Sequence, residues 1–253
     1  MNPTSVETDA IPAVLSDDGA RFANSKSGTQ LMPRIDRRYA PLEASIAHAA
    51  RWLSDREQAE LATWRDPGRR TAWLVGRTLA KQLVADRETA PSGDAGATPR
   101  IDILSRDEAG RVNRPRIWCD GVARPWSLSI SHTRRGVLAV LSTATGVALG
   151  VDLTEADSFS DRFVGLWFTP AERAWFGETQ STTTGQFIWA AKEAIYKACN
   201  TGESFAPRDV EVRADGRCRY RDTWRDDCRL QSWNLDGQLA VLAVARSQRD
   251  TQQ

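Results

Sequence analysis

The octapeptide Val147-Ala-Leu-Gly-Val-Asp-Leu-Thr154 alternates large apolar residues with small or polar ones, which is the period of a β-strand. The opposite face from the large residues carries Asp152 beside Ala148 and Gly150, whose small side chains leave room for another element to approach. Taken alone, the pattern also fits an edge strand with a solvated polar face. The four large apolar residues are Val147, Leu149, Val151 and Leu153.

This strand lies where two similar runs of predicted elements meet. Before it, apolar residues at helical spacing occupy about 42–86, and strand-like runs occupy 101–104, 127–131 and 137–141. After it, helical patterns cover 163–176 and 186–199, and strand patterns cover 210–212, 217–220, 229–233 and 239–244. Helices precede strands twice, which predicts an α+β protein with halves at 42–147 and 148–246. We expect a mobile leader over 1–41, a loop over 90–99 and a short tail over 247–253.

Composition excludes several classes of protein. The chain has 253 residues, 41% apolar and 26% charged, which is ordinary for a soluble globular protein. A formal net charge of +1 argues against a nucleic-acid binder that uses its whole surface. No apolar run approaches the ~20 residues that span a bilayer, and the first ten residues lack the features of a secretory signal. We therefore expect a cytoplasmic protein with neither nucleic-acid nor membrane partners.

Cysteine and lysine usage narrow the chemistry. The four cysteines are scattered without a C-x-x-C pair and the chain has two histidines, so a zinc site is not expected and the thiols should be reduced. Metal chemistry must then rest on oxygen ligands. Only four of the 34 basic residues are lysines, and two of these, Lys192 and Lys197, lie close together. In so arginine-rich a chain, a lysine is expected where a compact ammonium group is needed.

The stretch from Gln186 to Cys199 is the clearest helix, and it carries charged groups at functional spacing. Glu193 and Lys197 lie one turn apart on the face opposite the apolar stripe, with Lys192 on the flank. A surface helix with one Glu–Lys pair also explains this spacing. The large aromatic Trp189 on the polar face and the pair of lysines favour a metal-bound phosphate instead. Together with Asp152, Glu193 would give Mg²⁺ the one or two carboxylates that it usually takes from a protein.

A third candidate feature is Ser131-His132, at the end of a predicted strand. Adjacent strand residues point to opposite faces, so these two cannot act as nucleophile and base. His132 is either a phosphate-contacting imidazole or a structural residue at the end of the strand.

In this order the three segments resemble the phosphopantetheinyl transferases of the Sfp type. That family has an S-H pair, then G-[IV]-D-x-E, then W-x-x-K-E-x-x-x-K. This chain has Ser131-His132, Gly150-Val-Asp-Leu-Thr154 and Trp189-Ala-Ala-Lys-Glu-Ala-Ile-Tyr-Lys197. Weaker similarities are Phe168-Thr-Pro-Ala-Glu172, where Thr169 can cap a helix and Pro170 fits its first turn, and Asn113-Arg-Pro115.

The resemblance implies two similar α+β halves related by a pseudo-two-fold, each with a small, mainly antiparallel sheet packed on helices and the active site between them. It implies transfer of the phosphopantetheine arm of coenzyme A to a serine of an apo carrier protein (acyl, polyketide or peptidyl), with Mg²⁺ or alternatively Mn²⁺. A chain whose two halves form their own cleft needs no partner subunit, so we expect a monomer. Asp152 and Glu193 would ligate the metal, Glu193 would be the base with Glu172 as second candidate, and Lys197 would stabilise the transferred phosphoryl group. The implied coenzyme A contacts are Arg69, Arg70, Arg77, Arg114, Ser131, His132, Lys192 and Lys197.

One position departs from the family pattern. The final Glu of G-x-D-x-E is Thr154 here, and Glu155 would point away unless the strand ends or bulges. We therefore expect a metal held by two protein carboxylates. Two other functions also fit these residues: a Mg²⁺-dependent phosphohydrolase or nuclease, which would need no carrier protein, and a non-catalytic module that binds coenzyme A or a carrier protein.

Overall fold

The computed structural model describes residues 33–42, 52–88, 99–106, 112–155 and 158–247, and the fold is α+β with small antiparallel sheets, as predicted. The first run of elements is β1 (Asp36–Pro41), α1 (Asp55–Ala62), α2 (Pro67–Glu88), β2 (Ile101–Arg106), β3 (Val112–Cys119), β4 (Val122–Arg124), β5 (Ser127–His132) and β6 (Gly136–Ser142). The second run is β7 (Val147–Thr154), α3 (Asp161–Trp167), α4 (Pro170–Thr179), α5 (Thr182–Cys199), the 3-10 helix η2 (Pro207–Asp209), β8 (Val210–Val212), β9 (Cys218–Tyr220), β10 (Thr223–Trp224), β11 (Arg229–Leu235) and β12 (Gln238–Arg246).

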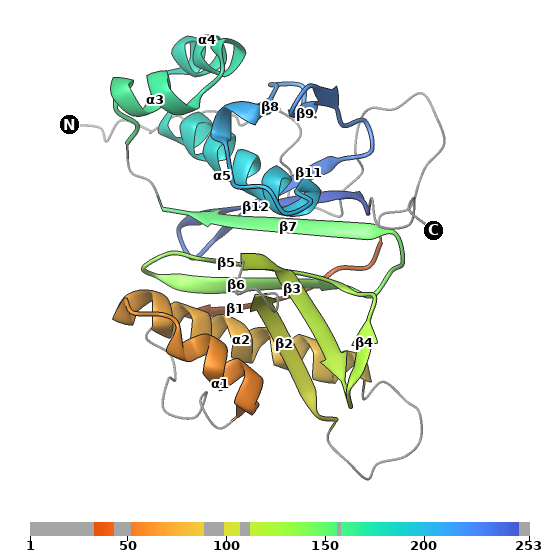
Figure 1. Ribbon diagram of the computed structural model, residues 1–253. Coiled ribbons are helices and arrows are strands. Elements are labelled where there is room, and N and C mark those ends of the chain that lie inside the picture. The colour runs from red at the N-terminus through yellow and green to blue at the C-terminus, as the bar shows by residue number, and fades with distance from the viewer. Residues whose placement is uncertain (1–32, 43–51, 89–98, 107–111, 156–157, 248–253) are drawn as a thin grey trace, which may run out of the picture.

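The two runs have matching sheet topologies. In the first run the strand orders are β1-β6-β5 and β2-β3-β4, and in the second they are β7-β12-β11 and β10-β9-β8. We call the sheets β1-β6-β5 and β7-β12-β11 the two large sheets, and β2-β3-β4 and β10-β9-β8 the small sheets. Figure 1 shows the two large sheets stacked at the centre of the molecule, with α5 covering one and α2 covering the other. The second run begins at β7, next to the boundary predicted at residue 148. A two-fold axis between the halves stays a prediction.

The middle strands of the two large sheets, β6 and β12, are apolar on both faces because a helix packs on one face and the other large sheet packs on the opposite face. In β6, Val137, Ala139 and Leu141 pack toward α2, while Leu138 and Val140 pack toward the other large sheet. The same alternation in β12 places its odd-numbered residues against α5 and its even-numbered residues against β6 and β7. Burying each of these aliphatic side chains contributes roughly 1.5–3 kcal/mol. The layered core therefore fixes the two sheets, and the strands at their edges, face to face.

Three serines of β5 connect the halves across this core. The backbone N–H groups of Leu149, Val151 and Leu153 on β7 donate to the hydroxyl groups of Ser127, Ser129 and Ser131 at 2.8, 3.0 and 3.1 Å. β7 is an edge strand, so without these acceptors its N–H groups would be buried and unpaired. The alternation of serine with apolar residues in β5 thus forms a ladder of side-chain hydrogen bonds, which we call the serine ladder.

Gly150 determines how closely α5 approaches β7. A Cβ atom built at Gly150 would lie 1.9 Å from the carbonyl oxygen of Ala194 and 2.6 Å from the backbone nitrogen of Ala198. The space predicted beside Asp152 is therefore occupied by the backbone of α5 itself. This close approach brings the polar residues of α5 to the level of Asp152.

Each half contains a buried carboxylate at the start of a helix. Glu57 closes a capping box in α1 and pairs with Lys81, and Glu172 closes one in α4 and pairs with Lys192. Each carboxylate also accepts a backbone N–H from a strand of the small sheet in its own half. These donors are Ile103 at 3.0 Å and Val212 at 2.9 Å. Thr169 and Pro170 occupy the cap and first turn of α4, as predicted.

The N-terminal boundary of the fold differs from the sequence expectation. The predicted leader extends to residue 41, but Asp36–Pro41 forms strand β1 on the edge of the first large sheet. Its charged residues disguise the strand pattern: Asp36 pairs with Arg87 and Arg38 with Asp86, as an exposed edge strand permits. Residues 1–32, most of the loop 90–99 and the tail beyond 247 lie outside the described residues.

All four cysteines are buried and form no disulfide in the structure. Within the described ranges, no helix combines the length and hydropathy needed to cross a membrane.

Candidate functional site

Asp152, Glu193 and Lys197 meet at the contact between β7 and α5. The ammonium group of Lys197 lies 2.7 Å from Asp152 Oδ1 and 3.5 Å from Glu193 Oε2, and it also donates to the carbonyl of Val151 at 3.1 Å. The predicted contact between Glu193 and Lys197 is therefore present. Asp152 is buried, and the side chains of Glu193 and Lys197 keep 29% and 26% of their surface exposed. A ligand can reach the two α5 side chains from solvent while Asp152 lies behind them.

The electrostatics of this cluster favour an additional cation. Burial and the adjacent charge of Asp152 raise the pKa of Glu193 to about 7, against the opposing effect of Lys197. Burial lowers the pKa of Lys197, but Asp152 and Glu193 together outweigh that effect and raise it overall. Lys197 is thus a cation at neutral pH, yet its single charge leaves Glu193 difficult to ionise. A divalent cation beside the two carboxylates would supply the missing positive charge.

The residues present therefore fit a magnesium ion held by Asp152 and Glu193, a hard-oxygen donor set. No third carboxylate joins Asp152 and Glu193 among the described residues, where no three His, Cys, Asp or Glu side chains form a group that could hold a metal ion. β7 ends at Thr154, and Glu155 turns to Arg134, accepting from its backbone N–H at 3.3 Å and its side chain at 3.0 Å. Glu155 therefore does not replace the missing ligand.

Ser131 orients Asp152 from the other half of the molecule. Its hydroxyl group donates to Asp152 Oδ1 at 2.8 Å and accepts the N–H of Leu153 at 3.1 Å. A serine hydroxyl carries one proton, so this proton is committed to Asp152. The predicted contact of Ser131 with coenzyme A stays a prediction, and the structure adds a contact of its hydroxyl group with the Asp152 carboxylate.

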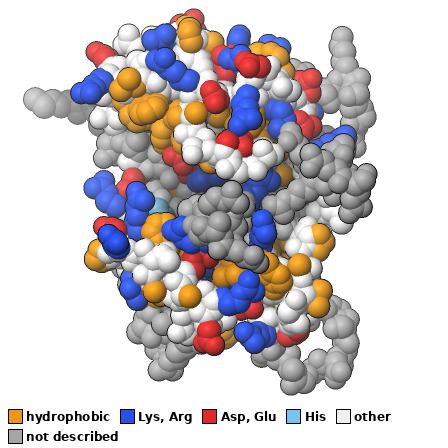
Figure 2. Space-filling view, in the orientation of Figure 1, with side chains coloured by type: hydrophobic (Ala, Val, Ile, Leu, Met, Phe, Trp, Pro, Cys, Tyr) orange, Lys and Arg blue, Asp and Glu red, His pale blue; other side chains and the backbone are white. Residues whose placement is uncertain are grey.

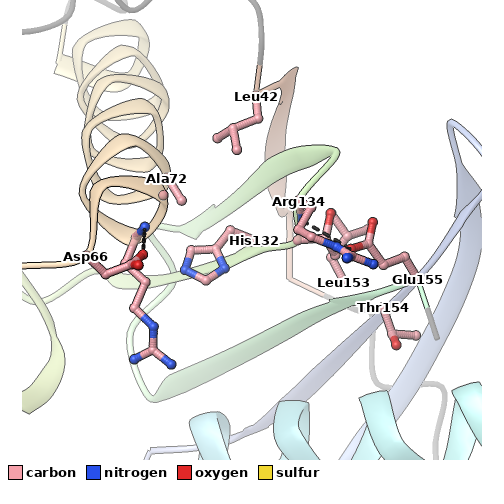
Figure 3. Close-up of a pocket in the computed structure, with 11 residues that line it drawn as sticks. Leu42, Asp66, Ala72, His132, Arg134, Leu153, Thr154 and Glu155 are labelled. Atoms are coloured by element: carbon pink, nitrogen blue, oxygen red, sulfur yellow. Dashed lines mark hydrogen bonds and ion pairs between the residues drawn. The ribbon is translucent and has the colours of Figure 1, made fainter.

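A pocket of about 420 Å³ opens next to this cluster, between the start of α2, the turn after β5 and the end of β7. Its lining includes Arg69, His132, Arg134 and Thr154. Figure 2 shows Lys and Arg side chains along the band between the two halves, with a histidine at one end of it. In Figure 3, His132 lies between Asp66 at the start of α2 and Arg134 in the turn. The pocket thus brings together an imidazole, two guanidinium groups and the carboxylates of Asp66 and Glu155, of which Glu155 pairs with Arg134 at 3.0 Å.

Three predicted site residues lie elsewhere. Lys192 has no exposed surface and donates to Glu172 at 2.6 and 2.8 Å, so it cannot contact a phosphate in the cleft. Glu172 is equally buried and cannot act as the base. Arg77 is buried, paired with Glu60 at 3.1 Å and stacked on Trp73. The resemblance implied roles in the active site for these three residues, but each of their side chains neutralises a buried partner.

The two remaining arginines also differ from the pocket-lining Arg69. Arg70 is exposed on α2 and is not part of the pocket lining. Arg114, expected at a phosphate, donates to the carbonyl groups of Ala198 and Asn200 at the end of α5. Sequence reasoning missed Arg134, whose only signal was its position two residues after His132.

A comparison with curated proteins gave no match. Residues 148–245, which carry Asp152, Glu193 and Lys197, match the family model of the 4'-phosphopantetheinyl transferase superfamily.

Proposed function

We propose that this protein transfers the phosphopantetheine arm of coenzyme A to a serine hydroxyl group of an apo carrier protein and releases 3',5'-adenosine bisphosphate. The family match over 148–245 supports phosphopantetheine transfer in general. The observation that carries the proposal is the convergence of Asp152, Glu193 and Lys197 beside a pocket at the junction of the halves. Neither strand nor helix alone contains this combination.

The pocket suits the nucleotide end of coenzyme A. Its volume of about 420 Å³ lies in the range of small-molecule sites, and its lining places Arg69, Arg134 and His132 around the same space. Guanidinium groups bind phosphates through paired, charge-assisted hydrogen bonds. Leu153 and Thr154 line this pocket and directly follow Asp152, so a nucleotide here would direct its pyrophosphate toward the carboxylates.

In the proposed reaction, the oxygen of the carrier serine forms a bond to the β-phosphorus of coenzyme A. The bond from that phosphorus to the bridging oxygen breaks, and 3',5'-adenosine bisphosphate leaves with the electron pair. Lys197 is placed to offset the negative charge on the transferred group. Glu193 faces the same site and is our candidate acceptor of the serine proton.

Asp152 and Glu193 would hold Mg²⁺, which supplies Lewis-acid stabilisation of the phosphate oxygens. Ser131 and Lys197 hold the Asp152 carboxylate in place through hydrogen bonds of 2.8 and 2.7 Å. The site therefore depends on both halves of the protein.

The proposal is tested by mass spectrometry of an apo carrier protein incubated with coenzyme A and Mg²⁺, with acyl, polyketide and peptidyl carriers assayed separately. We expect a mass gain of one phosphopantetheine arm on at least one carrier. Asp152→Asn and Glu193→Gln should each reduce the rate at least about 100-fold. Glu178→Gln, on the exposed face of α4, is the matched control and should leave the rate unchanged.

Two outcomes would contradict the proposal. Magnesium-dependent hydrolysis of a phosphodiester without any carrier would indicate a phosphohydrolase. Coenzyme A binding without modification of any carrier class would indicate a binding module.

A further inference from the structure

We infer that Arg114 is a positioning residue that caps the C-terminus of α5 from the opposite half and thereby holds Lys197 in the site, an inference that rests on the proposed function. Arg114 lies on β3 in the first half. Its Nη2 atom donates to the carbonyl oxygen of Ala198 at 2.7 Å and to that of Asn200 at 2.5 Å. Both acceptors closely follow Lys197, in the second half.

The end of α5 needs such a donor. The last four carbonyl groups of a helix have no partner within the helix. The backbone N–H and the side-chain amide of Asn200 both donate to the carbonyl oxygen of Tyr196, each at 2.8 Å. Its side chain reaches the carbonyl of Lys197 only at 3.4 Å. Arg114 donates a hydrogen bond to the carbonyl oxygen of Ala198, and its positive charge lies at the negative end of the helix dipole.

The local structure of β3 explains why Arg114 reaches so far. The pairing of β2 with β3 is regular from Ile101 to Leu104 and then shifts before Arg106. Arg114 lies in this irregular stretch, where a strand bends and redirects its side chains. Pro115 follows it, restricts Arg114 to extended backbone and has no N–H to donate to the ladder. The shifted pairing and Pro115 thus mark the part of β3 from which Arg114 extends to α5.

The cap acts on the site through the last turn of α5. On one side, this turn is packed against Gly150 of β7, where the backbone nitrogen of Ala198 lies 2.6 Å from the position that a Cβ atom would take. On another, Arg114 holds the carbonyl of Ala198, the residue after Lys197. Lys197 reaches Asp152 and Val151 from between these two constraints. A shift of about 1 Å in a positioned group can lower a catalysed rate about 100-fold, so loss of the cap should be visible in the rate.

Steady-state kinetics with Arg114→Gln and Arg114→Met tests this assignment. The two side chains have similar size, but only Gln can donate to a carbonyl oxygen. We expect kcat to fall about 10- to 100-fold in Arg114→Met and several-fold less in Arg114→Gln, with KM for coenzyme A within about two-fold of wild type in both. The same losses should appear with 3'-dephospho-coenzyme A as the donor.

A nucleotide contact would produce a different pattern. KM for coenzyme A would rise at least about five-fold in both variants, and kcat would hold. If Arg114 contacted the 3'-phosphate, the penalty would disappear with the dephosphorylated donor. Either result overturns the positioning role.

Hydrogen exchange provides a readout that is independent of activity. In Arg114→Met, amides of residues 196–200 should exchange about ten-fold faster than in wild type, while those of α2 should not change. Unchanged exchange at 196–200 would refute the cap. If the wild-type protein modifies no carrier but the exchange result holds, the proposed function fails and the structural assignment stands.

Discussion

Replacing Ser129 with alanine should test how firmly the serine ladder connects the halves. Ser129 keeps 4% of its surface exposed, and its hydroxyl group accepts the N–H of Val151 at 3.0 Å. It is the middle step of the ladder, whereas Asp152 and Lys197 are contacted by Ser131, the next step along. The substitution therefore removes one acceptor between the halves while leaving the candidate site intact.

The expected cost follows from the N–H group that is left behind. Val151 has no exposed surface, so water cannot replace the lost acceptor in the folded protein. A buried donor without a partner costs about 1–3 kcal/mol of unfolding free energy. For a chain of this length, each kcal/mol lowers Tm by about 2–4 °C, which gives a decrease of about 2–12 °C.

Differential scanning calorimetry of wild type and Ser129→Ala measures this decrease. Ser232→Ala on β11 is the matched control, because the Ser232 side chain makes no hydrogen bond to another described residue. Its Tm should change by less than the smallest decrease expected for Ser129→Ala. Transfer activity at room temperature should persist in both variants. If Tm for Ser129→Ala matched that of the control, the ladder would not contribute to joining the halves.

Other substitutions probe the packing of α5, the buried ion pair and acid stability. Gly150→Ala should displace α5 and lower both Tm and the transfer rate. Gly165→Ala is the control: nothing lies within 4 Å of its Cβ position, so the substitution should raise the stability of its helix by up to ~1 kcal/mol. Thermal melts and rate assays compare the two variants. Lys192→Met strands the charge of Glu172 and should cost about 3–5 kcal/mol in denaturant unfolding, a loss that adding Glu172→Gln should partly reverse. Burial raises the pKa of Glu203, but hydrogen bonds outweigh it and hold that pKa at about 2, below the unfolded value of about 4.3. Its contribution to stability is therefore complete above about pH 4.3 and is lost as pH falls toward about 2, so acid unfolding of Glu203→Gln should show a weaker pH dependence over this interval; an unchanged slope would contradict the shift.

Local periodicity in the sequence was sufficient for much of the fold. The alternation in 147–154 predicted which face of β7 carries Asp152, and the cap at Thr169 predicted where α4 begins. The helical spacing of Glu193 and Lys197 predicted their contact. These features depend on residues within one or two turns of each other, so the chain specifies them locally. The charged strand β1 was missed because its pairing with β6, rather than its own pattern, makes it a strand.

The partners of the buried charges were decided only by tertiary structure. Lys192 and Lys197 are five residues apart on one helix, yet one is enclosed with Glu172 and the other reaches Asp152. The family resemblance implied a phosphate contact for Arg114, whereas in the fold its side chain donates to carbonyl groups at the end of α5. Alternation placed Asp152 on a face of β7, but that face became a site because Gly150 admits the backbone of α5 and Ser131 reaches across from the other half. A charge takes its role from the groups that burial brings within hydrogen-bonding distance, and those groups come from distant parts of the chain.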